Sequence, residues 1–192
     1  IPERAARVRY RIAQALAFAG RSGAPDIPAR IRELADDATI AQLRRLSAQD
    51  QRHLIAVCDA LQRQGASDEL ALAGLLHDIG KEHEGRRPSV VDRSAKVVLS
   101  RIWPSGLARF LARSQALRFG GGLWIAGNHA RLGATIAEEL GVSDRVVWLI
   151  AHHEDRDPTD ANLRRLQQAD DDGRSIPAAS FREGGPRHGR DD

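Results

Sequence analysis

An apolar segment that ends in a histidine–aspartate pair constrains the fold of this chain more than any other feature. Residues 72–81 read LAGLLHDIGK, so an apolar helix delivers the imidazole of His77 and the carboxylate of Asp78 just before Gly80 and Lys81. Burying an unpaired charge is strongly unfavourable, and buried charged groups therefore have a partner or bind a metal. The sequence thus predicts that other polar side chains converge on this pair.

The length and composition of the chain limit the number of domains and the cellular compartment that we expect. Its 192 residues contain no apolar run near the ~20 residues needed to cross a bilayer, so we expect one folded domain and no membrane partner. The N-terminus has no apolar core typical of a signal peptide, and a single cysteine, Cys58, excludes an internal disulfide framework. These features predict a cytoplasmic protein.

The basic residues are very unevenly divided, with 27 arginines and only two lysines, Lys81 and Lys96. The net charge is only +3, and the arginines alternate with acidic residues along the expected helix faces. A nucleic-acid-binding surface would need a dominant basic patch, which this pattern does not supply. We therefore expect no nucleic-acid partner, and the sequence leaves the oligomeric state open.

Periodicity and capping signals divide the chain into many short helices. Ser47, Ser67 and Ser143 each precede an apolar run with helical spacing, and no segment alternates as a strand does. The sequence therefore predicts an all-α fold with about eight or nine helices. The expected helices span residues 2–20, 48–64, 68–80, 89–103, 106–117, 123–140, 144–153 and 161–169 or slightly beyond, and two short helical runs cover 29–35 and 39–46.

Three regions follow from this helix pattern. We expect residues 1–46 to form N-terminal helices packed on the core, and residues 47–171 to form the domain that holds His77 and Asp78. Residues 172–192 are rich in glycine, proline and charge and contain few apolar residues, which predicts a disordered tail.

Helical phase identifies further polar side chains that point inward, because residues three or four apart share one face of a helix. His53 is in phase with Val57 and Leu61 on the helix 48–64. His129 lies in the middle of an apolar stripe formed by Ile125, Leu132, Ile136 and Leu140.

The last two helices show the same pattern. Asp170 shares a face with Leu163 and Leu166, so a carboxylate turns toward the core. In the helix 144–153, the apolar face leads on to His153, whereas His152 is in phase with Leu149 and Trp148. Helical phase alone therefore favours His153 over His152 as an inward-facing residue.

The number of these inward-facing residues indicates a metal site more strongly than any one of them does alone. A lone inward histidine is more often a hydrogen-bonded core residue than a ligand. Several imidazoles from different helices, together with two carboxylates, are difficult to satisfy without a metal. Imidazole and carboxylate donors suit Mn, Fe, Zn, Ni or Co and disfavour calcium, which prefers all-oxygen sites, and structural zinc, which prefers cysteine.

The order and spacing of these residues resemble a known family. His53, His77-Asp78 and Asp170 follow the order of the HD superfamily of metal-dependent phosphohydrolases, and LLHDIGK is similar to its central motif. The segments NHARLGATIAEEL and LIAHHE resemble the subset with two metals, which includes the HD-GYP proteins. The resemblance covers about residues 47–171. The Gly-Tyr-Pro signature is missing, so hydrolysis of cyclic di-GMP is not implied.

The resemblance implies a set of metal ligands. His53, His77, Asp78 and Asp170 would hold a first metal, and Asp78 would also bind a second metal together with His129 and either His152 or His153. The similarity to HD-GYP proteins favours His152 and helical phase favours His153, so both remain candidates, with slightly more weight on His152. The resemblance implies one or two divalent transition metals as cofactor.

The resemblance also implies an activity. It predicts hydrolysis of a phosphomonoester or phosphodiester of a small molecule, with nucleotides among the candidates, by a hydroxide that bridges the metals. Asp78 and Lys81 would be catalytic, and Lys81 and Arg131 would contact the phosphate. Two alternatives stay open: an HD-type regulatory or ligand-binding module with little turnover, and a structural helical domain whose histidines are merely hydrogen-bonded.

Overall fold

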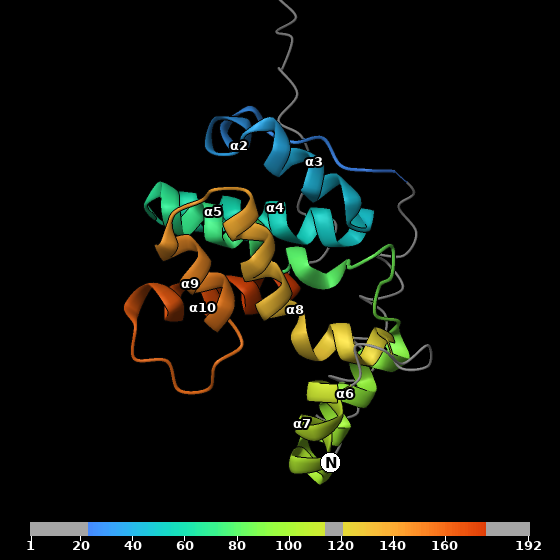
Figure 1. Ribbon diagram of the computed structural model, residues 1–192. Helices are drawn as coiled ribbons and strands as arrows, with labels where there is room; N and C mark the ends of the chain where they lie inside the picture. The colour runs from blue at the N-terminus through green and yellow to red at the C-terminus, as the bar shows by residue number, and fades with distance from the viewer. Residues whose placement is uncertain (1–22, 114–120, 176–192) are drawn as a thin grey trace, which may run out of the picture. The chain divides into compact units, whose positions relative to one another are not determined.

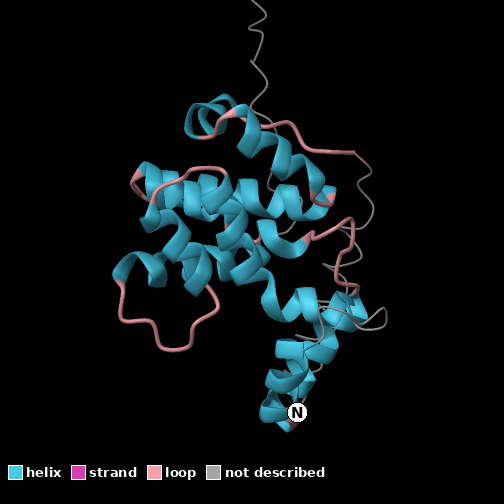
Figure 2. Ribbon diagram, viewed as in Figure 1, coloured by secondary structure: helices cyan, strands magenta, loops and turns pink. Residues whose placement is uncertain are grey.

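The computed structural model describes residues 23–113 and 121–175, and within them it confirms the all-α fold. The described part contains no strand, and the isolated bridge between His83 and Arg86 lies in a loop (Figure 2). The expected helix 2–20, the end of the helix 106–117 and the tail beyond residue 175 lie outside the described residues. The helices are α2 (Ala29–Leu34), α3 (Asp37–Arg45), α4 (Ala48–Arg63), α5 (Asp68–Leu76), η1 (Ile79–Lys81), α6 (Val90–Ile102), α7 (Pro104–Arg113), α8 (Gly121–Glu139), α9 (Asp144–His152) and α10 (Ala161–Ser175).

The apolar core lies among α4, α5, α8, α9 and α10 (Figure 1). Helix α5 packs against both α4 and α9, and α9 packs against α8. Helices α2 and α3 add Ile31 and Leu43, both fully buried, to the same core. None of the described helices has the length and hydrophobicity needed to cross a membrane. The core side chains that are fully buried include Leu54, Val57, Leu61, Leu75, Leu76, Leu149, Ile150 and Leu166.

The histidine–aspartate pair lies in a turn and not inside a helix. The sequence predicts one helix over residues 68–80, whereas α5 ends at Leu76 and the short 3-10 helix η1 begins at Ile79. His77 caps the C-terminus of α5, and Asp78 precedes η1 with φ −106° and ψ 10°, outside the helical region. The break frees Asp78 from the phase of α5, which allows its carboxylate to face residues from several helices.

A pair of glycines brings this turn against α8. A β-carbon on Gly80 would lie 2.2 Å from the carbonyl oxygen of His129 and 2.4 Å from the backbone nitrogen of Gly133. Only a residue without a side chain fits at that distance, since such contacts fall far inside van der Waals range. The absence of a side chain at Gly80 therefore places the backbone of His129 next to the turn that carries Asp78.

Helix α6 is attached to this core in an unusual way. It has no fully buried residue, and several of its valines face outward, among them Val91, which is 76% exposed. The sequence predicts that Pro104 ends this helix and that the next begins near residue 106. The structure instead begins α7 at Pro104, because proline is well tolerated in the first turn, where its missing N–H needs no helical partner.

The last described helix is longer than the periodicity predicts. Helix α10 runs from Ala161 to Ser175, so residues 172–175 of the expected tail are helical. Its inner face carries Leu163 and Leu166, then Ala169 and Asp170. The helix therefore extends beyond Asp170, which places this carboxylate within the helix and not at its end.

Candidate metal centre

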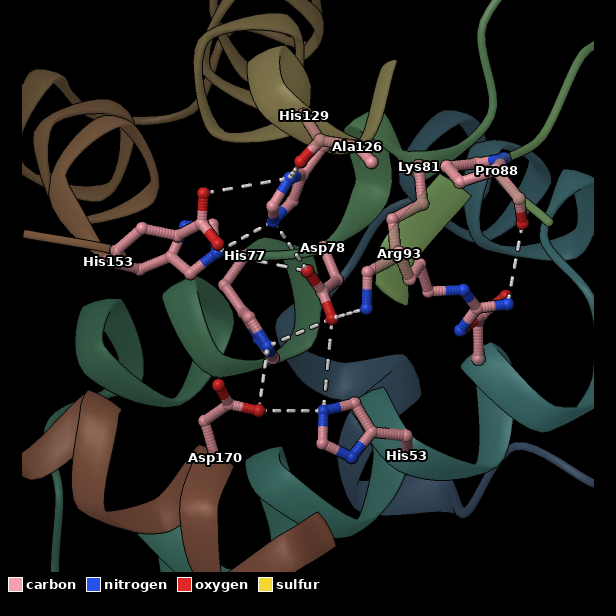
Figure 3. A network of polar contacts seen from close by, with 12 residues as sticks. His53, His77, Asp78, Lys81, Pro88, Arg93, Ala126, His129, His153 and Asp170 are labelled. Carbon is pink, nitrogen blue, oxygen red and sulfur yellow. Dashed lines mark hydrogen bonds and ion pairs between the residues drawn. The ribbon is translucent and has the colours of Figure 1, made fainter. Parts of the chain in front are cut away.

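Two groups of potential metal ligands meet at Asp78. His53, His77, Asp78 and Asp170 form the first group, and Asp78, His129 and His153 form the second. Within each group the donor atoms lie within 4.8 Å of one another. Figure 3 shows these side chains pointing toward a common centre, with the Asp78 carboxylate between the two groups.

The first group joins α4, the turn after α5, and α10. The Nε2 atom of His53 lies 2.9 Å from Oδ1 of Asp170 and 3.9 Å from Oδ2 of Asp78. The Nε2 atom of His77 lies 3.4 Å from each of the same two carboxylate oxygens. Two imidazole nitrogens and two carboxylates therefore surround one small space, with His77 and Asp78 fully buried.

The second group joins the same turn to α8 and the end of α9. The Nε2 atoms of His129 and His153 lie 3.2 Å and 3.8 Å from Oδ1 of Asp78. These two Nε2 atoms are only 3.2 Å apart. Asp78 thus presents one oxygen to each group.

Three of the histidine rings are fixed by the same backbone interaction. Each donates its Nδ1–H to the carbonyl oxygen three residues earlier: His77 to Gly74 at 2.9 Å, His129 to Ala126 at 3.0 Å, and His153 to Ile150 at 2.7 Å. A proton on Nδ1 leaves the lone pair of a neutral imidazole on Nε2. In the neutral form, each of the three rings therefore turns an electron pair toward Asp78, as metal-binding histidines do.

The polar atoms at the centre lack the hydrogen bonds that burial normally demands. Nε2 of His77 and Oδ1 of Asp78 are buried and have no hydrogen-bond partner in the described part of the chain. Buried polar groups are nearly always hydrogen-bonded, and the exceptions need an explanation. The facing Nε2 lone pairs of His129 and His153 would also repel each other without a cation between them. The imidazole and carboxylate donors present fit divalent transition metals.

Comparison with known families agrees with this geometry. The model of the HD domain family matches residues 50–176, more than half of the chain, and the match includes every residue of both ligand groups. The chain belongs to the HD domain family. No curated protein and no solved structure matches it. HD domains bind divalent metals and are generally metal-dependent hydrolases, which agrees with the donor set described above.

The electrostatic surroundings shift the pKa values of two buried histidines of the HD site in opposite directions. Burial alone would lower the pKa of His77, but the carboxylates of Asp78 and Asp170 outweigh it and raise this pKa to about 9. Burial and the neighbouring His77 lower the pKa of His153 to about 4. At neutral pH His77 therefore carries a proton that a metal must displace, whereas His153 is neutral and ready to bind.

Asp78 remains ionised in spite of its burial. Burial opposes the charged form, but Lys81 and His77 stabilise the carboxylate and hold the pKa of Asp78 well below its usual range. The Nζ atom of Lys81 contacts Oδ2 of Asp78 directly. The Lys81 side chain is 19% exposed, so its ammonium group lies between the buried carboxylate and solvent.

The structure brings together most of the residues that the sequence singles out. His53, His77, Asp78, His129, His153 and Asp170 form the two ligand groups, and Lys81 contacts Asp78. His152 lies elsewhere: its ring packs on Trp148 at a centroid distance of 4.5 Å, and its side chain is 37% exposed. The geometry therefore moves the slight preference for His152 to His153, because the inner face of α9 runs through Leu149 and Ile150 to His153.

Arg131 also lies apart from the ligand groups. It is exposed on α8, with its guanidinium 5.9 Å from the ring centre of Trp124 and 3.4 Å from the side-chain oxygen of Asn128. Arg131 follows His129 by two residues, and positions two apart on a helix do not share a face. None of its described contacts involves a ligand residue.

Two residues at the edge of the site are missed by the sequence reasoning. Lys96 on α6 contacts both carboxylate oxygens of Glu154, at 2.6 Å and 2.7 Å, and Oε2 of Glu154 lies 3.8 Å from Nδ1 of His129. Burial opposes ionisation of Glu154, but His129 and Lys96 outweigh it and lower its pKa. One signal was available for Lys96, since it is one of only two lysines in an arginine-rich chain.

Proposed function

We propose that this HD domain hydrolyses a phosphomonoester or phosphodiester of a small molecule, with nucleotides as the first substrates to test. The observation that carries the proposal is the shared carboxylate of Asp78, which offers one oxygen to each of two ligand groups in a buried site. We also propose that the chain is of the two-metal type, because the second group contains His129 and His153 in addition to Asp78.

The residues divide into ligands and substrate contacts. His53, His77, Asp78 and Asp170 would hold one divalent metal, and Asp78, His129 and His153 the other, with Fe, Mn, Ni, Co and Zn all compatible with these donors. When bound, such metals acidify a water molecule and neutralise phosphate oxygens. The buried imidazoles, fixed through Nδ1, keep their Nε2 atoms oriented and need no rearrangement.

Lys81 is the residue best placed to contact substrate. Its ammonium group touches Asp78 and is partly exposed, so it can donate to a phosphate oxygen on the solvent side of the site. Arg131 is left out of this role because its guanidinium packs over Trp124 on the exposed face of α8.

Metal content and turnover of three variants test this proposal. We expect wild-type protein purified without chelators to contain a divalent transition metal and to hydrolyse a phosphate ester. His77→Ala and Asp78→Asn should lose both metal and turnover, because each removes a donor from the buried centre. Asp172→Asn, which changes an exposed carboxylate on the same helix as Asp170, serves as the control. Elemental analysis measures the metal, and the proposal fails if neither ligand variant loses it.

A panel of substrates separates hydrolysis from ligand binding. The panel contains p-nitrophenyl phosphate, bis(p-nitrophenyl) phosphate and the common nucleotides, each tested with Mn, Fe, Co, Ni and Zn. Turnover that disappears in Asp78→Asn supports the hydrolase. Metal-loaded wild-type protein that turns over none of them would favour a regulatory or ligand-binding module.

A further inference from the structure

The only two lysines of the chain both lie at the HD site. Arginine fills 27 of the 29 basic positions, so lysine is the exception in this sequence. Lys81 contacts Asp78, and Lys96 contacts Glu154 beside His129. A lysine ammonium is a compact point charge, whereas a guanidinium is a wide planar fork. Both positions place that compact charge against a carboxylate close to the ligand residues.

Helix α6 leaves its valines more exposed than the lysine that makes this contact. Its exposed side chains include Val91 and Val98, at 76% and 53% exposure, whereas the Lys96 side chain is only 25% exposed. A surface helix normally buries its apolar stripe and leaves its charges in solvent. Helix α6 instead turns a lysine toward α9 and α8 and leaves its valines in solvent.

Glu154 lies where it can act on both histidines of the second ligand group. It follows His153 directly in the chain, and its Oε2 atom lies 3.8 Å from Nδ1 of His129. The His129 Nδ1–H is donated to Ala126, so the Glu154 carboxylate adds negative charge on the side of the ring opposite its Nε2. Negative charge at that position makes Nε2 a stronger donor and holds the ring in place.

The second group has more need of such support than the first. The first group contains the carboxylates of Asp78 and Asp170. The only carboxylate oxygen in the second group is Oδ1 of Asp78. Its other donors, His129 and His153, are imidazoles. A carboxylate just outside the group therefore supplies negative charge that its own ligands lack.

We propose that Glu154, held in place by Lys96, is a positioning residue for the second metal. The ion pair fixes the Glu154 carboxylate beside His129, and the carboxylate orients the imidazole and increases the donor strength of its Nε2. This inference rests on the two-metal form of the proposed function. It assigns a role to Lys96 and to α6 in setting whether the HD domain binds one metal or two.

Titration of the intact, metal-stripped 192-residue chain with Co²⁺ tests the inference without measuring activity. Visible absorbance and equilibrium dialysis report each bound ion. We expect wild type to bind two Co²⁺ per chain. Lys96→Gln and Glu154→Gln should each weaken the second ion about 10- to 100-fold and leave the first unchanged, as expected for loss of an outer partner of a ligand. Lys96→Arg, which keeps the ion pair, should retain most of the second-site affinity.

A matched control is available in the same part of the fold. Arg145 on α9 contacts both oxygens of Asp160, each at 2.7 Å, in an ion pair that touches no ligand residue. Arg145→Gln should leave both Co²⁺ affinities unchanged. If it weakens the second ion as much as Lys96→Gln does, general loosening of α9 explains the effect and the inference is overturned.

Reversal of the ion pair separates positioning from mere structural tethering. The double variant Lys96→Glu with Glu154→Lys keeps an ion pair between α6 and the end of α9 but places a cation beside His129. A structural tether would be restored by this exchange. We expect the second Co²⁺ to bind more weakly than in either single variant, and recovery of wild-type affinity would overturn the inference.

The outcomes distinguish this inference from the proposed hydrolysis. A wild-type stoichiometry of one Co²⁺ overturns the inference, since no second metal exists for Glu154 to support, but leaves hydrolysis at the first group open. Two Co²⁺ ions, with the second sensitive to Glu154→Gln, support the inference even if no phosphate ester is turned over.

Discussion

The two ligand groups of this HD domain share Asp78 but differ in charge and in origin. The first draws on residues as far apart as His53 and Asp170 and contains two carboxylates. The second takes its other donors from α8 and the end of α9, and both are imidazoles. Divalent cations bind more tightly where more negative charge surrounds them. From this difference we propose that the first group can hold a metal by itself, whereas the second depends on its neighbours.

The origins of the two groups lead to a second contrast. His53 and Asp170 approach within 2.9 Å across 117 positions of the sequence, so the first group forms only when α4 and α10 are both in place. His129 and His153 are 24 positions apart on two helices that pack together. Formation of the second group therefore requires only the packing of α9 on α8, whereas formation of the first group requires the fold of the whole domain.

Removing a carboxylate from the first group should produce the largest effect. Asp170→Asn leaves the first metal with a single carboxylate ligand, and we expect its affinity to fall about 100-fold or more, since even an outer partner of a ligand contributes 10- to 100-fold. Isothermal titration with Mn²⁺ or Co²⁺ measures the change. Asp171→Asn, its exposed neighbour on α10, is the control. An unchanged first affinity in Asp170→Asn would remove Asp170 from the ligand set.

Neighbouring histidines should behave differently in the second group. His153→Ala removes a donor that lies 3.8 Å from Asp78, and we expect the second metal alone to bind more weakly, by at least the roughly 10- to 100-fold that loss of an outer partner costs. His152→Ala removes a ring that packs on Trp148 and should leave both metals in place. The same titration applied to both variants shows which histidine binds the second metal. Loss of the second metal in His152→Ala alone would reverse the assignment.

The first group should also bind its metal more tightly as the pH rises. His77 has a pKa of about 9 in the folded protein, so a metal that binds between pH 7 and pH 9 must displace one proton. We expect the affinity to rise about tenfold per pH unit in this window and to level off above it. Titration calorimetry in buffers of different ionisation enthalpy counts the released protons. Affinity that does not change from pH 7 to pH 9 would contradict the raised pKa.

The same shift predicts how the metal-stripped protein responds to pH. The folded pKa of His77 lies above its unfolded value of about 6.5, so its proton stabilises the folded state. That contribution is fully present below about pH 6.5 and is lost as the pH rises through about 9. Thermal melts in EDTA should therefore show a decrease in Tm over this window, and His77→Gln should remove much of the decrease.

Much of the fold could be predicted from the sequence because local rules govern it. The N-caps at Ser47, Ser67 and Ser143 are found where the pattern predicts them, and α4 ends within one residue of the expected position. The break of α5 at Leu76 could not be predicted, because the close approach of Gly80 to α8 determines it and not the propensity of residues 77–80.

For the ligand groups too, local sequence patterns identify the inward-facing residues but not the long-range surface contacts. Helical phase placed His53, His129, His153 and Asp170 inward because burial repeats with the period of the helix. The pairing of Lys96 with Glu154 joins positions 58 residues apart at the surface, and no periodicity encodes such a contact. Helical phase also favours His153 over His152 as the inward-facing residue, since Leu149 and Ile150 define the buried face of α9.

The bonds from Nδ1 to the carbonyl three residues earlier have a consequence for how the domain acquires metal. At His77 and His153 the acceptor belongs to the last turn of the ring's own helix, where a carbonyl lacks a helical partner. Each ring is thus immobilised by its own helix before any ion arrives, and little side-chain entropy remains to be lost on binding. The favourable free energy of coordination is then retained as affinity, and an ion can leave and be replaced while the rings keep their orientation.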